Sequence, residues 1–142
     1  MAAIVILVDQ LTKWLVQELF QPGMSLPLWQ DIFHLTYVQN PGAAFGIFAH
    51  QQLFFILTTV VLFAVFLRFL SYIRRQGRCM ILGVALLLGG AVGNLVDRAR
   101  YGYVVDFFDF RIWPVFNVAD IAICVGVGLM VYAILFHMKE AE

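Results

Sequence analysis

The chain has 142 residues, of which 63% are hydrophobic and 13% are charged, and its formal net charge is zero. With a mean hydropathy of +0.89, this composition lies outside the range of soluble domains and predicts an integral membrane protein. No basic stripe runs along the sequence, so a nucleic acid partner is not expected. Cys79 and Cys124 belong to no paired spacing, which argues against a disulfide framework or a zinc site.

The first predicted membrane span covers residues 2–20 and carries Asp9 and Lys13 at a helical i,i+4 spacing. An acid one turn before a base is the order in which such pairs interact well, so mutual charge compensation inside the protein is the simplest explanation. The basic segment and cleavage site of a signal peptide are not recognisable in this stretch, and we expect the span to remain in the mature protein.

Residues 21–50 contain turn-forming prolines and glycines and an alternating segment at 34–38, which together predict an outer loop with short strands. A second span is expected over residues 52–72. It leads into a short loop at 73–79, and the positive-inside rule places that loop in the cytoplasm. The residues that set this orientation are Arg68, Arg74, Arg75 and Arg78.

A third span is expected over residues 80–96. A second outer loop, 97–117, follows it and contains a β-branched and aromatic segment at 103–110 that predicts a strand. A fourth span covers residues 118–137. Small residues on one stripe of the third span would allow another helix to approach closely, and they are Ala85, Gly89 and Gly93.

These segments predict an all-α membrane protein formed by a single integral domain over residues 1–142. About 20 apolar helical residues cross a bilayer core, so the chain length accommodates a bundle of four transmembrane helices. The strands of the outer loops form a small extramembrane region on the periplasmic side. With the 73–79 loop inside, both termini are cytoplasmic and the two outer loops share one face.

Three carboxylates, Asp97, Asp106 and Asp120, fall at this outer boundary, where ionisable groups are costly and usually functional. The two serines share no base, and the three histidines lack the spacing of a metalloprotease. Cys79 falls on the cytoplasmic side and Cys124 lies a turn inside an apolar helix, so a Cys–His protease is not expected. Two aspartates that share one proton can activate water without a metal or cofactor. The sequence therefore predicts aspartic-protease chemistry.

Local alternatives exist for both members of this pair. Asn117 and Asp120 have the spacing of a capping box at the start of the fourth span, so Asp120 has a structural explanation that is compatible with catalysis. A lone strand aspartate such as Asp106 is usually solvated. Its neighbours here are large and apolar, which predicts that its pKa is raised and that Asp106 holds the shared proton more often than Asp120.

Asn94, Asp97 and Arg98 lie on one face near the outer end of the third span. They fit either a polar cluster that closes the helix end or a functional arrangement. In the functional arrangement, Asp97 and Arg98 organise the loop that carries Asp106. Asn94 and Asn40 then bind the backbone of an extended substrate.

At these residues the chain closely resembles the bacterial lipoprotein signal peptidases, or signal peptidase II. The resemblance covers nearly the whole chain, and five blocks in the expected order make it very specific. The blocks are Asp9-Gln10-Leu11-Thr12-Lys13, Asn40-Pro41-Gly42-Ala43-Ala44-Phe45-Gly46, Gly93-Asn94-Leu95-Val96-Asp97-Arg98, Val105-Asp106-Phe107 and Phe116-Asn117-Val118-Ala119-Asp120.

The resemblance implies a four-helix aspartic endopeptidase of the inner membrane that removes signal peptides from prolipoproteins, cleaving before the diacylglyceryl-modified cysteine. It implies a monomer that works among membrane lipids without a cofactor or metal and is inhibited by the cyclic peptide globomycin. Asp106 and Asp120 match the catalytic pair. Eight further residues of this chain match family positions that support the site or bind substrate: Asp9, Lys13, Asn40, Gly42, Asn94, Asp97, Arg98 and Asn117.

Two other classes of protein account for part of the pattern. A small proton- or ion-coupled transporter would use Asp9, Lys13 and Asp120 to relay charge, but no internal repeat is evident and the acids cluster at one face. A non-catalytic assembly subunit would explain the small-residue stripe. It predicts that Asp106→Asn and Asp120→Asn leave function unchanged.

Overall fold

The computed structural model describes residues 1–42 and 50–137, so residues 43–46 of the second block lie outside the described residues. The described chain is mostly helical and carries a small three-stranded sheet. The helices are α1 (Ala2–Leu19), α2 (Gln52–Arg68), α3 (Leu70–Arg75), α4 (Arg78–Tyr101) and α5 (Val118–His137), and the strands are β1 (Ser25–Trp29), β2 (Phe33–Asn40) and β3 (Val104–Asp109).

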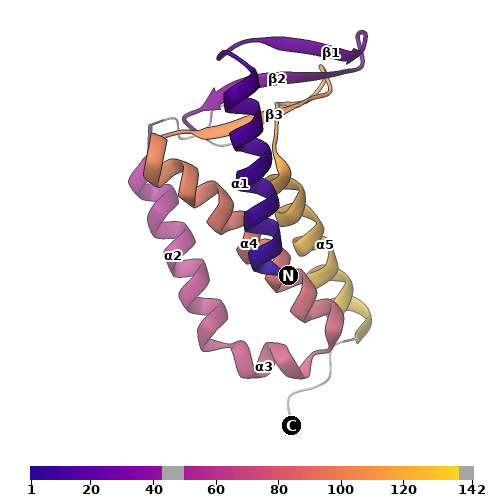
Figure 1. Cartoon of the computed structure of the whole chain (residues 1–142). Coiled ribbons are helices and arrows are strands. Elements are labelled where there is room, and N and C mark those ends of the chain that lie inside the picture. Colours follow the sequence, from indigo (N-terminus) through magenta and orange to yellow (C-terminus); the bar gives the residue numbers. More distant parts are fainter. Residues whose placement is uncertain (43–49, 138–142) are drawn as a thin grey trace.

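Helix α4 is the centre of the helical part, and α1, α2 and α5 all pack against it, with the sheet at one end and α3 at the other (Figure 1). In the described part of the chain, two helices are long and apolar enough to cross a membrane, α4 with 24 residues and α5 over 19 residues. Helix α2 is apolar but has 17 residues. A bundle of four membrane-spanning helices therefore stays a prediction.

Two helix boundaries differ from the sequence-based expectation. The expected 52–72 span is broken at Phe69, and the short helix α3 follows, covering part of the expected 73–79 loop. Helix α4 continues past residue 96 to Tyr101 and ends at Gly102, whose φ of 82° is the left-handed conformation that glycine favours at helix ends. Asp97 and Arg98 therefore lie on the last turns of a helix.

The sheet has the antiparallel order β1-β2-β3. The alternating segment forms β2, and the β-branched and aromatic segment forms β3, as expected. Val38 of β2 lies directly opposite Asp106 of β3 in the register. A buried cluster fixes the sheet on α1, and it comprises Val16, Tyr37, Val105 and Phe107.

Glycines allow α4 to approach both of its neighbours closely. A Cβ atom built on Gly89 would lie 2.9 Å from the carbonyl oxygen of Ala2 in α1. On the side facing α5, a Cβ atom on Gly83 would lie 2.7 Å from the carbonyl oxygen of Gly126. Two members of the expected stripe, Gly89 and Gly93, thus lie close to α1, and a second set of glycines packs against α5.

We expect Gly90→Ala to destabilise the protein, because its Cβ atom would collide with the carbonyl oxygen of Ala119 at the start of α5. Overpacking of this kind costs about 1–3 kcal/mol. Gly128→Ala is the matched control, since nothing lies within 4 Å of that position and alanine favours a helix more than glycine does. Thermal unfolding in detergent measures both, and equal stability of the two variants would contradict the tight α4–α5 packing.

Candidate active site

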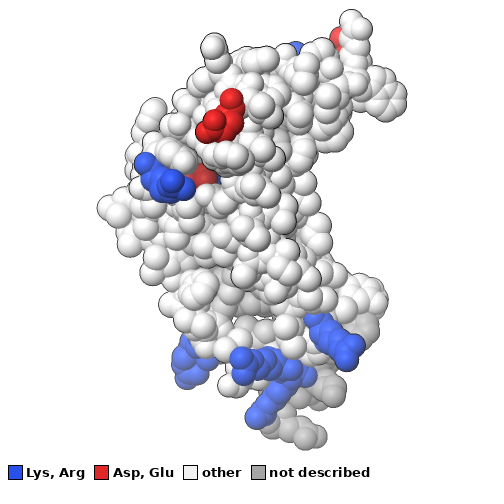
Figure 2. Space-filling view, in the orientation of Figure 1, with Lys and Arg blue, Asp and Glu red and all other residues white. Residues whose placement is uncertain are grey.

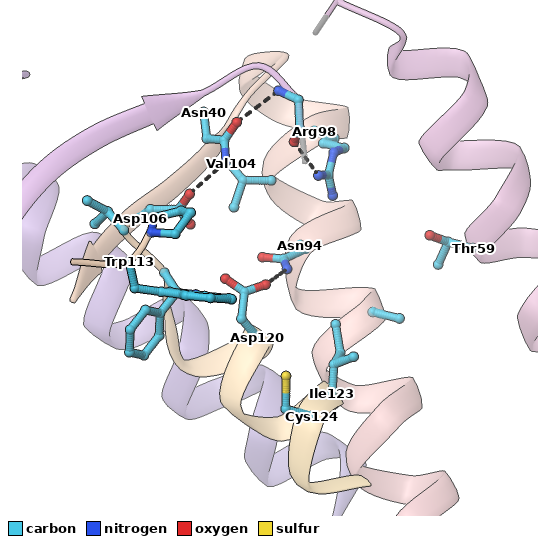
Figure 3. Close-up of a pocket in the computed structure, with 15 residues that line it drawn as sticks. Asn40, Thr59, Asn94, Arg98, Val104, Asp106, Trp113, Asp120, Ile123 and Cys124 are labelled. Carbon is cyan, nitrogen blue, oxygen red and sulfur yellow. Dashed lines mark hydrogen bonds between the residues drawn. The ribbon is translucent and has the colours of Figure 1, made fainter. Parts of the chain in front are cut away.

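A cavity of about 390 Å³ lies where the sheet meets α2, α4 and α5. Figure 3 shows Asp106 and Asp120 on one wall, with Asn94 beside them. Two expected support residues, Asn40 and Arg98, line the same space. The other lining residues are Gly42, Thr59, Ala91, Val104, Trp113, Pro114, Val115, Phe116, Ile123 and Cys124.

The Asp106 side chain is 2% exposed and accepts a hydrogen bond on each carboxyl oxygen. Asn117 Nδ2 donates to one oxygen at 2.7 Å and Asn40 Nδ2 donates to the other at 3.0 Å. Burial and the nearby charge of Asp120 raise the pKa of Asp106 to about 7, against the opposing effect of these two donors. The expected upward shift of the Asp106 pKa agrees with this environment.

Asp120 lies in the first turn of α5 and is partly exposed to the cavity. Asn117 Oδ1 accepts a hydrogen bond from the Asp120 backbone N–H at 2.9 Å, and Asp120 Oδ2 accepts one from the Asn117 backbone N–H at 3.1 Å. This is the reciprocal capping box expected from the spacing. The second carboxyl oxygen, Oδ1, accepts a hydrogen bond from Asn94 Nδ2 at 2.9 Å.

Asn117 therefore contacts both carboxyl groups, with its side-chain amide on Asp106 and its backbone N–H on Asp120. It is fully buried, and its amide also donates to Asn94 Oδ1 at 3.1 Å. Because one rigidly held residue binds both carboxyl groups, their relative position is fixed by the start of α5.

A buried ion cluster lies behind this wall. The Lys13 ammonium is 2.9 Å from Asp9 Oδ2 and 2.9 Å from Asp97 Oδ2, and it donates to Asn94 Oδ1 at 2.9 Å. The side chains of Lys13, Asp9 and Asp97 are each at most 2% exposed. Buried charges persist only when paired and hydrogen-bonded. The predicted Asp9–Lys13 pair is thus part of a larger cluster.

Three hydrogen bonds connect the ion cluster to the segments that carry Asp106 and Asp120. Asp97 accepts from the Val105 backbone N–H at 3.0 Å, next to Asp106. Asp9 accepts from the Ala119 backbone N–H at 2.9 Å, next to Asp120. Asn94, held by Lys13, donates to Asp120 itself. The cluster therefore positions both members of the pair.

Arg98 has a different set of partners. It donates to the carbonyl oxygen of Gly42 at 3.0 Å, and its guanidinium carbon lies 4.2 Å from the centre of the Phe55 ring. The Gly42 backbone N–H in turn donates to Asn40 Oδ1 at 3.0 Å. Asp97 makes the expected contact with the segment that carries Asp106. Arg98 instead binds the chain after β2, and through Gly42 it helps to hold the Asn40 amide that donates to Asp106.

The two carboxyl groups have different environments on the same cavity. One is buried and protonated more readily than an ordinary aspartate, and the other is open to the cavity at a helix N-terminus, where a negative charge is favoured. Groups separated in this way can act as a general acid and a general base on one bound substrate.

The family model described as Signal peptidase (SPase) II matches residues 1–136. The chain belongs to the signal peptidase II family. Among similar proteins, the lipoprotein signal peptidase of Moorella thermoacetica is 48% identical, with 99% of this chain and 93% of that protein covered. The lipoprotein signal peptidase of Pelotomaculum thermopropionicum is 50% identical, with 94% and 88% covered.

Two solved structures are also similar, and both are described as bacterial membrane enzymes studied by the in meso method. The one at 2.3 Å resolution has a TM-score of 0.87 and 32% identity, with 99% of this chain and 92% of the other covered. The one at 1.9 Å resolution has a TM-score of 0.80 and 30% identity, with 96% and 91% covered. The resemblance to signal peptidase II is confirmed.

In this signal peptidase II chain, the ten site residues expected from the sequence are all described, and they form two connected groups. Six of them line the cavity: Asn40, Gly42, Asn94, Arg98, Asp106 and Asp120. The others lie behind it: Asp9, Lys13, Asp97 and Asn117.

The amides of Asn40 and Asn94 donate to Asp106 and Asp120, and the expected binding of a substrate backbone by these two residues stays a prediction. Two polar residues of the site, Thr59 and Gln10, were not expected. Gln10 donates to Asp97 Oδ1 at 2.8 Å and to the carbonyl oxygen of Gly93 at 3.1 Å. Its position one residue after Asp9 inside an apolar span was the signal that could have identified it.

Proposed function

We propose that this member of the signal peptidase II family is an aspartic endopeptidase that removes signal peptides from bacterial prolipoproteins, cleaving before the diacylglyceryl-modified cysteine. The observation that carries the proposal is the Asp106–Asp120 pair, which faces one cavity and is bound by one residue, Asn117. The names of the related proteins support the choice of substrate.

In the proposed reaction, ionised Asp120 takes a proton from water while the water oxygen attacks the scissile carbonyl carbon. Protonated Asp106 gives its proton to the carbonyl oxygen. The resulting tetrahedral intermediate then collapses as Asp120 passes its proton to the leaving nitrogen and Asp106 recovers a proton from the hydroxyl group. Each aspartate ends in its starting state, so one water is consumed and no cofactor is needed.

An apolar groove is consistent with the proposal that the substrate is lipid-modified. It has a volume of about 380 Å³ and lies between α2 and α4. Thr59 lines both this groove and the cavity that holds the two aspartates. Burial of acyl chains stabilises a complex by about 0.8 kcal/mol per CH₂ group. The remaining lining residues are apolar, namely Val60, Phe63, Ala64, Leu67, Val92 and Leu95.

We place the protein in the bacterial inner membrane with four spans, both termini in the cytoplasm and the active site toward the outer face. Figure 2 shows most of the visible blue side chains at the end of the molecule where α3 lies, while further blue atoms appear in the half that carries the sheet. This distribution supports the orientation through the positive-inside rule. We further propose that the protein works as a monomer and that globomycin inhibits it.

The decisive experiment incubates the purified protein in detergent with a peptide that carries a signal sequence and a diacylglyceryl-modified cysteine. Mass spectrometry of the products is expected to show a single cut before that cysteine, and the same peptide without the lipid is expected to react much more slowly. Globomycin is expected to block the cut. Ion flux across proteoliposomes without any peptide cleavage would support the transporter instead.

The rate of cleavage is expected to fall as the pH rises through about 7. Burial and the charge of Asp120 raise the pKa of Asp106 to about 7, so Asp106 holds its proton below this pH and loses it above. Because the proposed reaction needs that proton, kcat/KM should fall about tenfold per pH unit on the alkaline side. A rate that increases through pH 7 would contradict the assignment of Asp106 as the acid.

A further inference from the structure

Asp106 borders a second, smaller cavity in addition to the one it shares with Asp120. This cavity has a volume of about 230 Å³, which is far more than the roughly 10–15 Å³ that a single water needs. Asn40, Asp106, Pro114 and Val115 line both spaces. The other lining residues are Val38, Gln39 and Pro41. We name this space the β2 cavity.

The two spaces next to Asp106 are built from different parts of the chain. The larger cavity includes Thr59 of α2, Ala91 of α4 and Cys124 of α5. The β2 cavity contains no helical residue among those described, and it is formed by the end of β2, by β3 and by the segment before α5. Asp106 thus stands between a space among the helices and a space beside the sheet.

A peptide cut at Asp106 must have one part on each side of the scissile bond. In a prolipoprotein, the part before the bond is an apolar signal sequence, which fits the space among the helices. The part after the modified cysteine belongs to a water-soluble protein, which fits a space that lies beside the sheet and outside the helices. The two spaces therefore match the two sides of the substrate.

We propose that the β2 cavity binds the first residues that follow the modified cysteine, and that Val38 limits their size. This inference rests on the proposed function. Val38 lies opposite Asp106 in the β2–β3 register, and side chains of directly paired residues point to the same face of a sheet. Val38 lines the β2 cavity and is not part of the larger cavity.

The chemistry of the lining residues defines the preferred ligand. Val38, Pro41, Pro114 and Val115 offer apolar contacts, and Asp106, protonated in the proposed reaction, is the ionisable residue among the described lining residues. A carboxylate in the substrate would lose its hydration beside these apolar side chains, and none of the described lining residues is a cation that could pair with it. The β2 cavity therefore selects small, uncharged residues directly after the cysteine.

The test uses two lipid-modified peptides that differ at the position after the cysteine, with glycine in one and tryptophan in the other. Wild type is expected to favour the glycine peptide by about tenfold or more in kcat/KM, in the range typical of steric selection in a pocket. Val38→Ala is expected to reduce this preference, and Val38→Trp is expected to increase it, mainly through the KM of the tryptophan peptide.

Leu26→Trp is the matched control, because Leu26 lies on β1 with its side chain 43% exposed and should leave the preference unchanged. The pH profile of every variant should match that of wild type, since Val38 takes no part in proton transfer. Cleavage of both peptides with the same preference in wild type, Val38→Ala and Val38→Trp would overturn the assignment of the β2 cavity alone. A wild type that cleaves neither peptide overturns the proposed function as well.

Discussion

Asp106→Asn and Asp120→Asn are each expected to reduce cleavage by about 10²- to 10⁴-fold, the range attributed to general acid–base groups. Asparagine can neither give nor accept the proton at the required step. The measurement is kcat with the lipid-modified peptide at saturating concentration. In the proposed reaction both carboxyl groups act on the same water and carbonyl, so the double variant should be little slower than either single variant.

Loss of activity counts only if the variants remain folded. Asparagine has the size of aspartate and keeps one of the two acceptor oxygens at either position, and Asp106→Asn removes a carboxyl group that is costly to bury, so we expect both variants to remain folded, as thermal unfolding can measure. Asp109→Asn is the matched control on the same strand, because Asp109 binds Thr36 and Arg111 and does not line the cavity. A folded Asp120→Asn variant with wild-type kcat would rule out the catalytic pair.

Lys13→Met is expected to destabilise the fold by about 3–5 kcal/mol, the cost typical of leaving buried charges without a partner. The variant loses the ammonium that contacts Asp9, Asp97 and Asn94. Two carboxylates then lie in the interior with no cation beside them. Thermal unfolding in detergent, followed by circular dichroism, measures the change.

Arg111→Met is the matched control for an ion pair at the surface. Arg111 is 2.9 Å from Asp109, but its side chain is 49% exposed, and exposed pairs contribute about 0–1 kcal/mol. The combined variant Lys13→Met with Asp9→Asn should recover part of the lost stability, because one unpaired charge is removed. Equal destabilisation by Lys13→Met and Arg111→Met would show that the buried cluster is unimportant to the fold.

The sequence predicts the site best where its contacts are local. The Asp9–Lys13 pair and the Asn117–Asp120 capping box both follow from helical spacing, and both are present at distances of 2.9–3.1 Å. The strand that carries Asp106 was also predicted, because β-branched and aromatic residues surround it. These features depend on residues within a few positions of one another.

Contacts between distant segments could not be predicted from the sequence. Spacing does not tell which face of one helix meets another, so the contact of Lys13 with Asp97 and that of Asp9 with the Ala119 N–H were not predicted. The break at Phe69 was missed for a related reason. Hydropathy shows where a chain is apolar but not whether the backbone continues as one helix.

The internal arrangement of the ion cluster has a consequence for how the chain is made. Asp9 and Lys13 neutralise each other within α1, so this helix carries no uncompensated charge at its core when it leaves the ribosome. Asp97 arrives much later, when α4 is synthesised, and finds a preformed cation together with the Gln10 amide to receive it. With the proposed membrane topology, successive insertion of the helices can therefore proceed without exposing a lone ammonium group to lipid.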